Sequence, residues 1–214
     1  MSREQQSKVL ILLSGGLDSS LTAAYLKQIG KIVYGLFIDR GQRNLEKEMQ
    51  ATKRVSEILG LNMLYESSFS LKGIRDLLTP EIISKRGIPG RNLILISIAT
   101  PYADLLDCDL IATGNITSDD YPDCNTYFRE SYSQVLSLVL ERHISVVSPF
   151  ADWEKWDKAD EIKWGSENGY EEVINTTWTC WKLGQKHCGE CPACLGRRKG
   201  FRKAGIPDPT EYGL

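Results

Sequence analysis

The chain has 214 residues, with 26 lysine and arginine side chains against 28 aspartate and glutamate side chains and a formal net charge of -2. This length suffices for one sizeable α/β core with a small appended module, and the near-neutral charge disfavours a nucleic acid as direct ligand. No apolar run is long enough to span a membrane and no signal-peptide pattern is present, so we expect a cytoplasmic protein.

The first predicted elements are a strand at residues 9–13 and a helix at residues 21–29, joined by a serine- and glycine-rich turn. A helix that begins directly after a strand aims its unpaired N–H groups at the turn, and glycines let an anion approach the backbone closely. Asp18 would repel phosphates unless Mg²⁺ lay between them, so the turn predicts a nucleotide with Mg²⁺ rather than an ordinary loop. The expected contacts are Leu13, Ser14, Gly15, Gly16, Leu17, Asp18, Ser19 and Ser20.

This turn has neither the Walker spacing nor the dinucleotide-binding spacing, and it holds no lysine to neutralise a γ-phosphate. It resembles the S-G-G-x-D-S signature of the PP-loop ATP pyrophosphatases. That resemblance implies an enzyme that adenylates a carboxylate, amide or base oxygen and releases pyrophosphate.

A second buried strand is predicted at residues 31–39, followed by a helix at 43–59 and a weaker strand at 61–66. Asp39 and Gln42 follow the carboxyl end of the second strand, where open α/β sheets bind ligands, and we therefore add them to the ATP site. The alternation of strands and helices predicts a doubly wound, mainly parallel sheet.

Residues 67–90 contain a short helical patch at 71–78 and are either a surface loop or a lid over the nucleotide. An unusually apolar helix is predicted at 92–106. Arg91 precedes it, and an arginine at the start of a buried helix either joins an anion site or is solvated.

A fourth strand at 109–114 leads into a polar loop at 115–125, whose acids and aromatic residue are explained either by a ligand or by turn chemistry. A helix at 127–140, a fifth strand at 145–150 and a helix at 157–168 complete a five-stranded sheet.

Four of the six cysteines lie close together, at Cys180, Cys188, Cys191 and Cys194. In a reducing compartment such a cluster is more typical of a metal site than of disulfides, and four thiolates complete a closed, structural Zn²⁺ site. An iron–sulfur cluster is the alternative, and His187 is a competing ligand. We divide the chain into a nucleotide-binding α/β domain at 1–175 and a helical zinc module at 176–214, whose basic helix we expect to be solvated.

Together these motifs resemble the 7-cyano-7-deazaguanine synthase family of the PP-loop superfamily. The matching segments follow the family's order along nearly the whole chain, at residues 14–19, 41–43, 89–92, 121–124, 179–180 and 188–194. Where the family usually has Asp-Tyr-Gly-Gln-Arg-His, residues 39–44 read Asp-Arg-Gly-Gln-Arg-Asn, and the segments at 67–88 and 115–121 look shorter than usual.

The resemblance implies an adenine nucleotide α-hydrolase-like fold that converts 7-carboxy-7-deazaguanine and ammonia to 7-cyano-7-deazaguanine through adenylated intermediates, in queuosine or related deazapurine biosynthesis. It implies a homodimer that acts on small molecules. The expected catalytic residues are Ser14, Asp18, Ser19 and Arg91. The expected base pocket contains Arg91, Asn92, Tyr121, Asp123 and Trp181, although Asp123 is equally explained as the cap of its own turn.

Three other functions stay open. A divergent paralogue that couples a deazaguanine to a macromolecule is favoured by Arg40 and the shortened segments. A PP-loop tRNA thiolase would use Cys108 or Cys124 as sulfur carrier or cluster ligand. A zinc-ribbon binding module without catalysis would have no need of Asp18.

Overall fold

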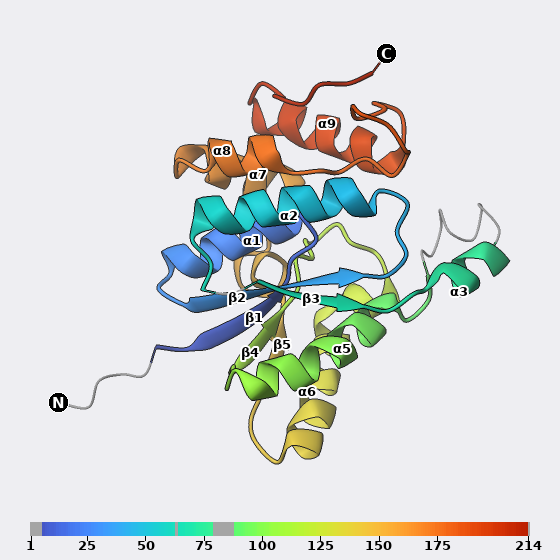
Figure 1. Ribbon diagram of the computed structural model, residues 1–214. Coiled ribbons are helices and arrows are strands. Elements are labelled where there is room, and N and C mark those ends of the chain that lie inside the picture. The colour runs from blue at the N-terminus through green and yellow to red at the C-terminus, as the bar shows by residue number, and fades with distance from the viewer. Residues whose placement is uncertain (1–5, 63, 79–87, 214) are drawn as a thin grey trace.

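A parallel five-stranded sheet forms the centre of the computed structural model, which describes residues 6–62, 64–78 and 88–213 (Figure 1). The strands are β1 (Lys8–Leu12), β2 (Ile32–Asp39), β3 (Leu64–Ser68), β4 (Leu110–Ala112) and β5 (Ser145–Val147). Their order is β3-β2-β1-β4-β5, and every neighbouring pair is parallel. The predicted doubly wound sheet is therefore confirmed, and its strand order reverses at β1, the place where such sheets bind ligands.

Helices cover both faces of the sheet (Figure 1). They are α1 (Leu17–Gln28), α2 (Leu45–Leu59), α3 (Lys72–Leu77), α5 (Arg91–Leu105), α6 (Thr126–Leu140), α7 (Lys158–Glu167), α8 (Glu171–Thr176) and α9 (Pro192–Ala204). On one face α1 and α2 lie beneath a second layer of α7, α8 and α9, and α5 and α6 cover the other face. Within the described ranges, none of these helices combines the length and apolar character that crossing a membrane requires.

The centre strand is buried on both sides, as its continuous apolar sequence predicts. Val9 and Ile11 belong to the core that α1, α2, α7 and α9 close, whereas Leu10 belongs to the core under α5 and α6. All three are 0% exposed. Alternate residues of a strand face opposite sides of the sheet, so β1 holds the two helical layers together.

Several boundaries differ from the prediction. β3 begins at Leu64 rather than at residue 61, and β5 ends at Val147, after which the chain forms a π-helical turn at Phe150–Glu154. The six-residue α8 was not predicted because it is too short to show helical periodicity. The helical patch at 71–78 is confirmed as α3, but the segment at 67–90, expected as either a surface loop or a lid, includes residues 79–87, which lie outside the described residues.

Candidate active site and metal centre

The serine- and glycine-rich turn lies at the carboxyl end of β1, between Leu12 and Leu17. Gly15 has a φ of 70°, and a Cβ atom there would lie 2.5 Å from the carbonyl oxygen of Glu48. A glycine is therefore required for α2 to pack directly against the turn. Gly16 is the N-cap of α1 and has no side chain to cap it, which leaves the first N–H groups of the helix available to an anion.

Two serine hydroxyls face each other across this turn. Ser14 Oγ and Ser19 Oγ are 3.1 Å apart, and the Ser14 amide donates to Ser19 Oγ at 3.2 Å. The structure thus brings together the two hydroxyls that the sequence assigned to phosphate. Leu13 and Leu17 belong to the core under the turn, and Ser20 is fully buried.

Asp18, the acid of the turn, accepts a hydrogen bond from the ammonium of Lys158, the first residue of α7. Lys158 Nζ also lies 3.4 Å from Glu161 Oε1, and Glu161 is 0% exposed. Burial tends to raise the pKa of Asp18, but the charge of Lys158 and the hydrogen bonds with Glu161 and Lys158 together hold the pKa below the ordinary value of 3.8. Burial and the nearby Asp18 carboxylate raise the pKa of Glu161 well above 4.5.

Sequence reasoning missed Lys158 as a site residue. It lies 140 residues from Asp18 along the chain, and its local sequence indicates only the start of a helix. Gly114, just after β4, was missed for the same reason. A Cβ atom at Gly114 would lie 2.6 Å from the backbone nitrogen of Ser19, so the chain after β4 packs directly on the start of α1.

The chain after β2 forms the adjacent wall. Gln42 Oε1 accepts from the Arg40 amide at 2.8 Å, and Asp39 Oδ1 accepts from the Gly41 amide at 2.9 Å. Arg40, at the position where the family usually has tyrosine, pairs with Glu48 at 3.3 Å. Burial lowers the pKa of Arg40, Glu48 opposes this, and the positive charge of Arg91 lowers the pKa further.

Asn92 and Asp123 meet at the start of α5. Asp123 Oδ2 accepts from the Asn92 amide at 2.8 Å, and the Asn92 side chain donates to the Asp123 carbonyl oxygen at 3.3 Å and to Cys124 Sγ at 3.0 Å. Asp123 thus caps a helix from another part of the chain. Tyr121 precedes it and is partly buried, whereas Trp181 lies on the cysteine-bearing segment and is 50% exposed.

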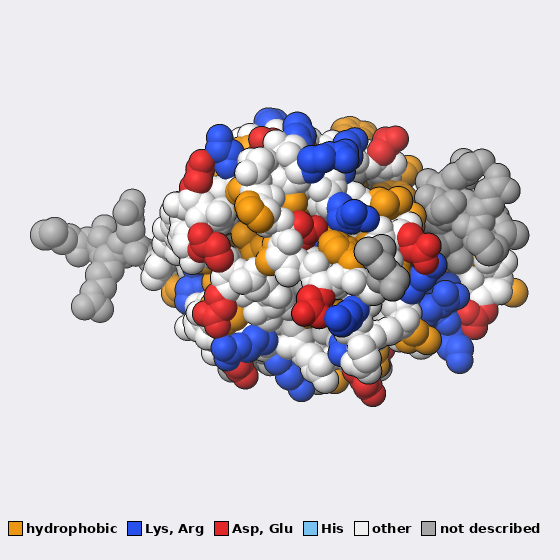
Figure 2. Space-filling model, turned by 90° about the horizontal axis from the view of Figure 1, so that it is seen from above, with side chains coloured by type: hydrophobic (Ala, Val, Ile, Leu, Met, Phe, Trp, Pro, Cys, Tyr) orange, Lys and Arg blue, Asp and Glu red, His pale blue; other side chains and the backbone are white. Residues whose placement is uncertain are grey.

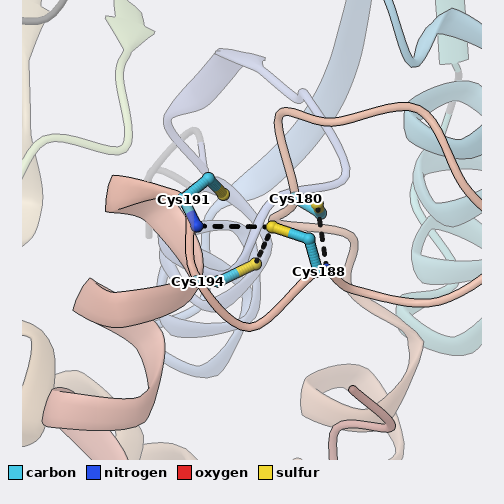
Figure 3. A group of neighbouring side chains, drawn as sticks. All are labelled: Cys180, Cys188, Cys191 and Cys194. Atoms are coloured by element: carbon cyan, nitrogen blue, oxygen red, sulfur yellow. Dashed lines mark hydrogen bonds between the residues drawn. The ribbon is translucent and has the colours of Figure 1, made fainter. Parts of the chain in front are cut away.

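The four clustered cysteines converge on one point (Figure 3). The sulfur atoms of Cys180, Cys188, Cys191 and Cys194 all lie within 4.8 Å of one another. Cys191 is the N-cap of α9 and Cys194 lies in its first turn, so the helix start fixes the spacing of these two sulfurs.

Backbone amides surround these sulfurs. Cys180 Sγ accepts from the amides of Lys182 and Cys188 at 3.3 and 3.4 Å, and Cys188 Sγ accepts from the Cys191 amide at 3.3 Å. Burial tends to raise the pKa of Cys188, but the amides of Glu190 and Cys191 lower it to about 6. Because metals bind thiolates, this arrangement fits a tetrahedral four-sulfur site.

His187 is turned to another partner. Its Nε2 accepts from the Thr179 amide at 3.0 Å, and its ring lies 4.3 Å from that of Trp178. Burial lowers the pKa of His187 to about 4, so the ring is neutral at physiological pH. A structural role thus accounts for this side chain.

The cysteine-bearing segment contacts the nucleotide turn directly. The Trp178 amide donates to the Gly15 carbonyl oxygen at 2.8 Å. Asn44, buried at the start of α2, donates from Nδ2 to the carbonyl oxygens of Cys180 and Lys182, both at 2.8 Å. The cysteine cluster and the serine- and glycine-rich turn therefore share a boundary.

The expectation that the basic stretch at 197–203 is solvated is wrong for Arg197. Its side chain is 1% exposed and donates to Thr177 Oγ1 and Thr210 Oγ1 at 2.7 Å and to the Ile174 carbonyl oxygen at 3.0 Å. Arg198 and Lys199 are exposed, as expected. On the face over α8 and α9, basic and acidic side chains are interspersed rather than gathered into one basic patch (Figure 2).

The two remaining cysteines are buried apart from this cluster. Burial raises the pKa of both Cys108 and Cys124 to about 12. Cys124 Sγ also accepts hydrogen bonds from Asn92 and Asn115, at 3.0 and 3.2 Å. Neither thiol is ionised near neutral pH, and an ionised thiol is what a sulfur carrier needs.

Comparison with known families gives a match to the one described as "Queuosine biosynthesis protein QueC", over residues 8–205. The 7-cyano-7-deazaguanine synthase of Thermoplasma acidophilum is 35% identical, over 97% of this chain and 93% of its own length. That of Methanothrix thermoacetophila is 32% identical, over 96% and 98%.

Solved structures resemble the chain in fold. A predicted subunit of tRNA methyltransferase from Methanocaldococcus jannaschii has a TM-score of 0.50 and 23% identity, over 75% of this chain and 76% of its own. A 4-thiouridine synthetase, in a complex with RNA and bound ATP, has a TM-score of 0.51 and 18% identity, over 78% and 42%.

Proposed function

Because the chain belongs to the family of the queuosine biosynthesis protein QueC, we propose that it is an ATP-dependent 7-cyano-7-deazaguanine synthase. The observation that carries this proposal is the alignment of nearly the whole chain with nearly the whole length of synthases that have this name. The substrates are 7-carboxy-7-deazaguanine, ATP and ammonia, and the product serves queuosine or a related deazapurine biosynthesis.

The reaction requires two activations of a poor electrophile. Ammonia does not displace oxide from a carboxylate at neutral pH, but transfer of AMP to the carboxylate, with release of pyrophosphate, creates a good leaving group. Ammonia then displaces AMP and forms the amide. Adenylation of the amide oxygen by a second ATP lets that oxygen leave with AMP, and loss of the nitrogen's protons gives the nitrile. No side-chain nucleophile is needed, so the protein's work is to position the reactants and stabilise charge.

The nucleotide turn supplies the positioning. The free N–H groups at the start of α1 and the facing hydroxyls of Ser14 and Ser19 would bind the phosphates. Asp18 would hold Mg²⁺, which neutralises phosphate oxygens when bound. Asp39 and Gln42 would contact ATP from the end of β2. Arg91, the first residue of α5, would bind the substrate carboxylate or a phosphate.

The base would bind beside the start of α5. Asp123 holds the Asn92 amide with one oxygen, and its other oxygen is suited to the N–H edge of a guanine-like ring. Tyr121 or Trp181 would stack on the ring. The Asn92 side chain completes the polar part of this pocket.

The four cysteines would hold a structural Zn²⁺. Four sulfur ligands leave no open position for substrate, so the metal would brace the segment that contacts Gly15 and Asn44. We place the boundary of this zinc module at residue 176. The resemblance favours a cytoplasmic homodimer, and the net charge of -2 favours small-molecule ligands over nucleic acid.

The test is a reaction of the purified protein with ATP, Mg²⁺, ammonia and 7-carboxy-7-deazaguanine, followed by mass spectrometry of the base and quantification of AMP. We expect the nitrile, with two AMP formed for each molecule. If only the amide accumulates, the protein catalyses the first step alone and does not form the nitrile. Consumption of ATP only when a macromolecule is added would instead support the divergent paralogue.

A further inference from the structure

The thiol of Cys124 joins three segments of the chain. Cys124 ends the short helical turn at Pro122–Cys124 and is 4% exposed. Its Sγ accepts from the side-chain nitrogen of Asn92, the second residue of α5, at 3.0 Å. It also accepts from the side-chain nitrogen of Asn115, in the loop after β4, at 3.2 Å. Two amides from distant parts of the chain therefore converge on one sulfur atom.

The position of Cys124 is fixed independently of these two amides. Its carbonyl oxygen accepts from the guanidinium of Arg129, whose side chain is 2% exposed. Asp152 holds that guanidinium in turn, with its Oδ2 at 2.8 Å from Arg129 Nε. Because such a buried, charged network is rigid, the sulfur is the fixed partner and the asparagine side chains are the groups that it orients.

The sulfur completes the hydrogen bonding of the Asn92 amide nitrogen. That nitrogen carries two N–H donors, of which one reaches the Asp123 carbonyl oxygen at 3.3 Å and the other reaches Cys124 Sγ. These two acceptors determine which end of the amide is nitrogen and which is oxygen. Asn92 is half-buried, and among the described residues its Oδ1 has no hydrogen-bond partner. This oxygen is therefore available to a donor of a bound ligand.

The Asn115 amide is oriented by the same sulfur but has no atom to spare. Its Oδ1 accepts from Thr113 Oγ1 at 2.8 Å, and its Nδ2 donates to Asp119 Oδ2 at 3.2 Å as well as to Cys124 Sγ. Asn115 thus ties the sulfur to the end of β4. Of the two amides, Asn92 is the one that keeps a free acceptor.

We propose that Cys124 is a positioning residue of the base pocket, which holds the Asn92 amide so that its Oδ1 accepts a hydrogen bond from the N–H edge of the deazaguanine. This inference rests on the proposed function, which supplies the ligand. Without the sulfur, the Asn92 nitrogen loses one of the two acceptors that keep the amide from turning over. A reversed amide would present donors to the donors of the base, which disfavours binding. A neutral thiol suffices, because the sulfur acts only as an acceptor.

The experiment measures binding of the base separately from turnover, by titration calorimetry with 7-carboxy-7-deazaguanine. ATP binding is measured with Mg²⁺ and α,β-methylene-ATP, in which the α–β phosphate bridge cannot be cleaved. We expect Cys124→Ala to raise the Kd of the base about fivefold or more and to leave the Kd of the ATP analogue unchanged. Cys124→Ser, which restores an acceptor, should recover most of the affinity.

Cys108→Ala is the matched control. Cys108 is also buried, but no described residue donates a hydrogen bond to its sulfur, so this variant should change neither Kd. If Cys124→Ala and Cys108→Ala lower the melting temperature alike and leave the base Kd unchanged, Cys124 only supports the fold and the inference is overturned. Cys124→Val, which fills the volume and also lacks an acceptor, gives the same test if Cys124→Ala does not fold.

A double variant tests whether the sulfur acts through Asn92. Asn92→Ala alone should raise the Kd of the base, and adding Cys124→Ala should raise it no further, because the amide that the sulfur orients is already absent. Additive effects of the two substitutions overturn the inference and leave the proposed function standing. Failure of the parent protein to bind 7-carboxy-7-deazaguanine overturns the proposed function and the inference with it.

Discussion

The nucleotide turn and the cysteine module meet at one hydrogen bond, between Trp178 and Gly15, yet they are held in different ways. The turn is fixed by the sheet and by close backbone packing at Gly15 and Gly114. The module, residues 176–214, contributes no strand to the sheet, and its cysteines contact chiefly one another and nearby backbone amides. The difference indicates that the turn keeps its shape without a ligand, whereas the cysteine loop at 178–194 would depend on a bound metal, because in this module it is α9 that packs on α7 and the main core. Changes to the residues that would bind the ligand of the turn should therefore lower activity. Changes to the cysteines that would bind the metal should lower stability.

The largest expected effect is on the turn. Asp18→Asn removes the charge that would hold Mg²⁺ and should lower ATP turnover about 1000-fold or more. The melting temperature should change little, because Glu161, whose pKa the Asp18 charge raises, can ionise in the variant and pair with Lys158 instead. Steady-state pyrophosphate release and thermal unfolding check the two halves of this prediction. If the variant turns over ATP at nearly the rate of the parent protein, Asp18 does not hold the Mg²⁺ that the reaction needs.

The module should show the opposite pattern. Purified protein should contain one Zn²⁺ per chain by elemental analysis, and Cys191→Ser should destabilise residues 178–204 by roughly 3 kcal/mol or more, since metal binding and folding are coupled in such sites. Hydrogen exchange should report the loss in this segment while β1 and α1 stay protected. If protein purified without oxygen contains iron and sulfide and has a visible absorption band, the four cysteines hold an iron–sulfur cluster and not zinc.

The link between the two regions can be weakened alone. Asn44→Ala removes two hydrogen bonds to buried carbonyl oxygens and should cost about 2 kcal/mol of unfolding free energy. Asn62→Ala, at an exposed position, is the control and should cost less than about 0.5 kcal/mol. Denaturant unfolding measures both. Equal stabilities of the two variants would mean that Asn44 does not join the regions energetically.

A smaller effect is expected at the base pocket. Asp123→Asn can still cap α5 with its amide oxygen, but it places a donor where the base requires an acceptor. We expect the KM for the deazaguanine to rise about tenfold, the equivalent of about 1.4 kcal/mol, with the KM for ATP unchanged. Asp120→Asn, at an exposed position nearby, serves as control. If the kinetics of Asp123→Asn match those of the control, capping is the whole role of Asp123.

The smallest effect concerns the two isolated thiols. Burial raises the pKa of Cys108 and Cys124 to about 12, so at pH 8 only about one thiol in ten thousand is ionised, and alkylation should accelerate only as the pH rises toward 12 or the chain unfolds. After removal of the metal, Cys188 should react first, because its pKa is lowered to about 6. Peptide mass spectrometry after iodoacetamide treatment measures the order. Rapid labelling of Cys124 in native protein would instead favour the alternative function of a tRNA thiolase, in which Cys124 would carry sulfur.

The parts of this molecule that depend on neighbouring residues were predictable. The strand, turn and helix around Asp18 follow one another in sequence, and the spacing of the four cysteines reflects their common centre. The parallel sheet followed from the alternation of apolar strands with helices. In each case the pattern and its cause lie within a few tens of residues.

The missed features depend on contacts between distant segments. Lys158 reaches Asp18 from α7, Asn44 holds the module from the start of α2, and Asp123 caps a helix that begins at Arg91. Arg197 was expected to be solvated because its neighbours are basic, but α9 packs with a face that buries Arg197 together with Gly200 and Phe201. A single sequence carries no periodic signal for such pairings.

The buried guanidinium of Arg197 has a consequence for how the protein is made. Its donors reach Ile174 and Thr177 upstream and Thr210 downstream, and an unmatched buried donor would cost about 1–3 kcal/mol. During synthesis Thr210 is the last of these partners to leave the ribosome, after all four cysteines have emerged. All five strands emerge before Thr210, so the sheet has its whole sequence available before this closure of the C-terminal segment becomes possible.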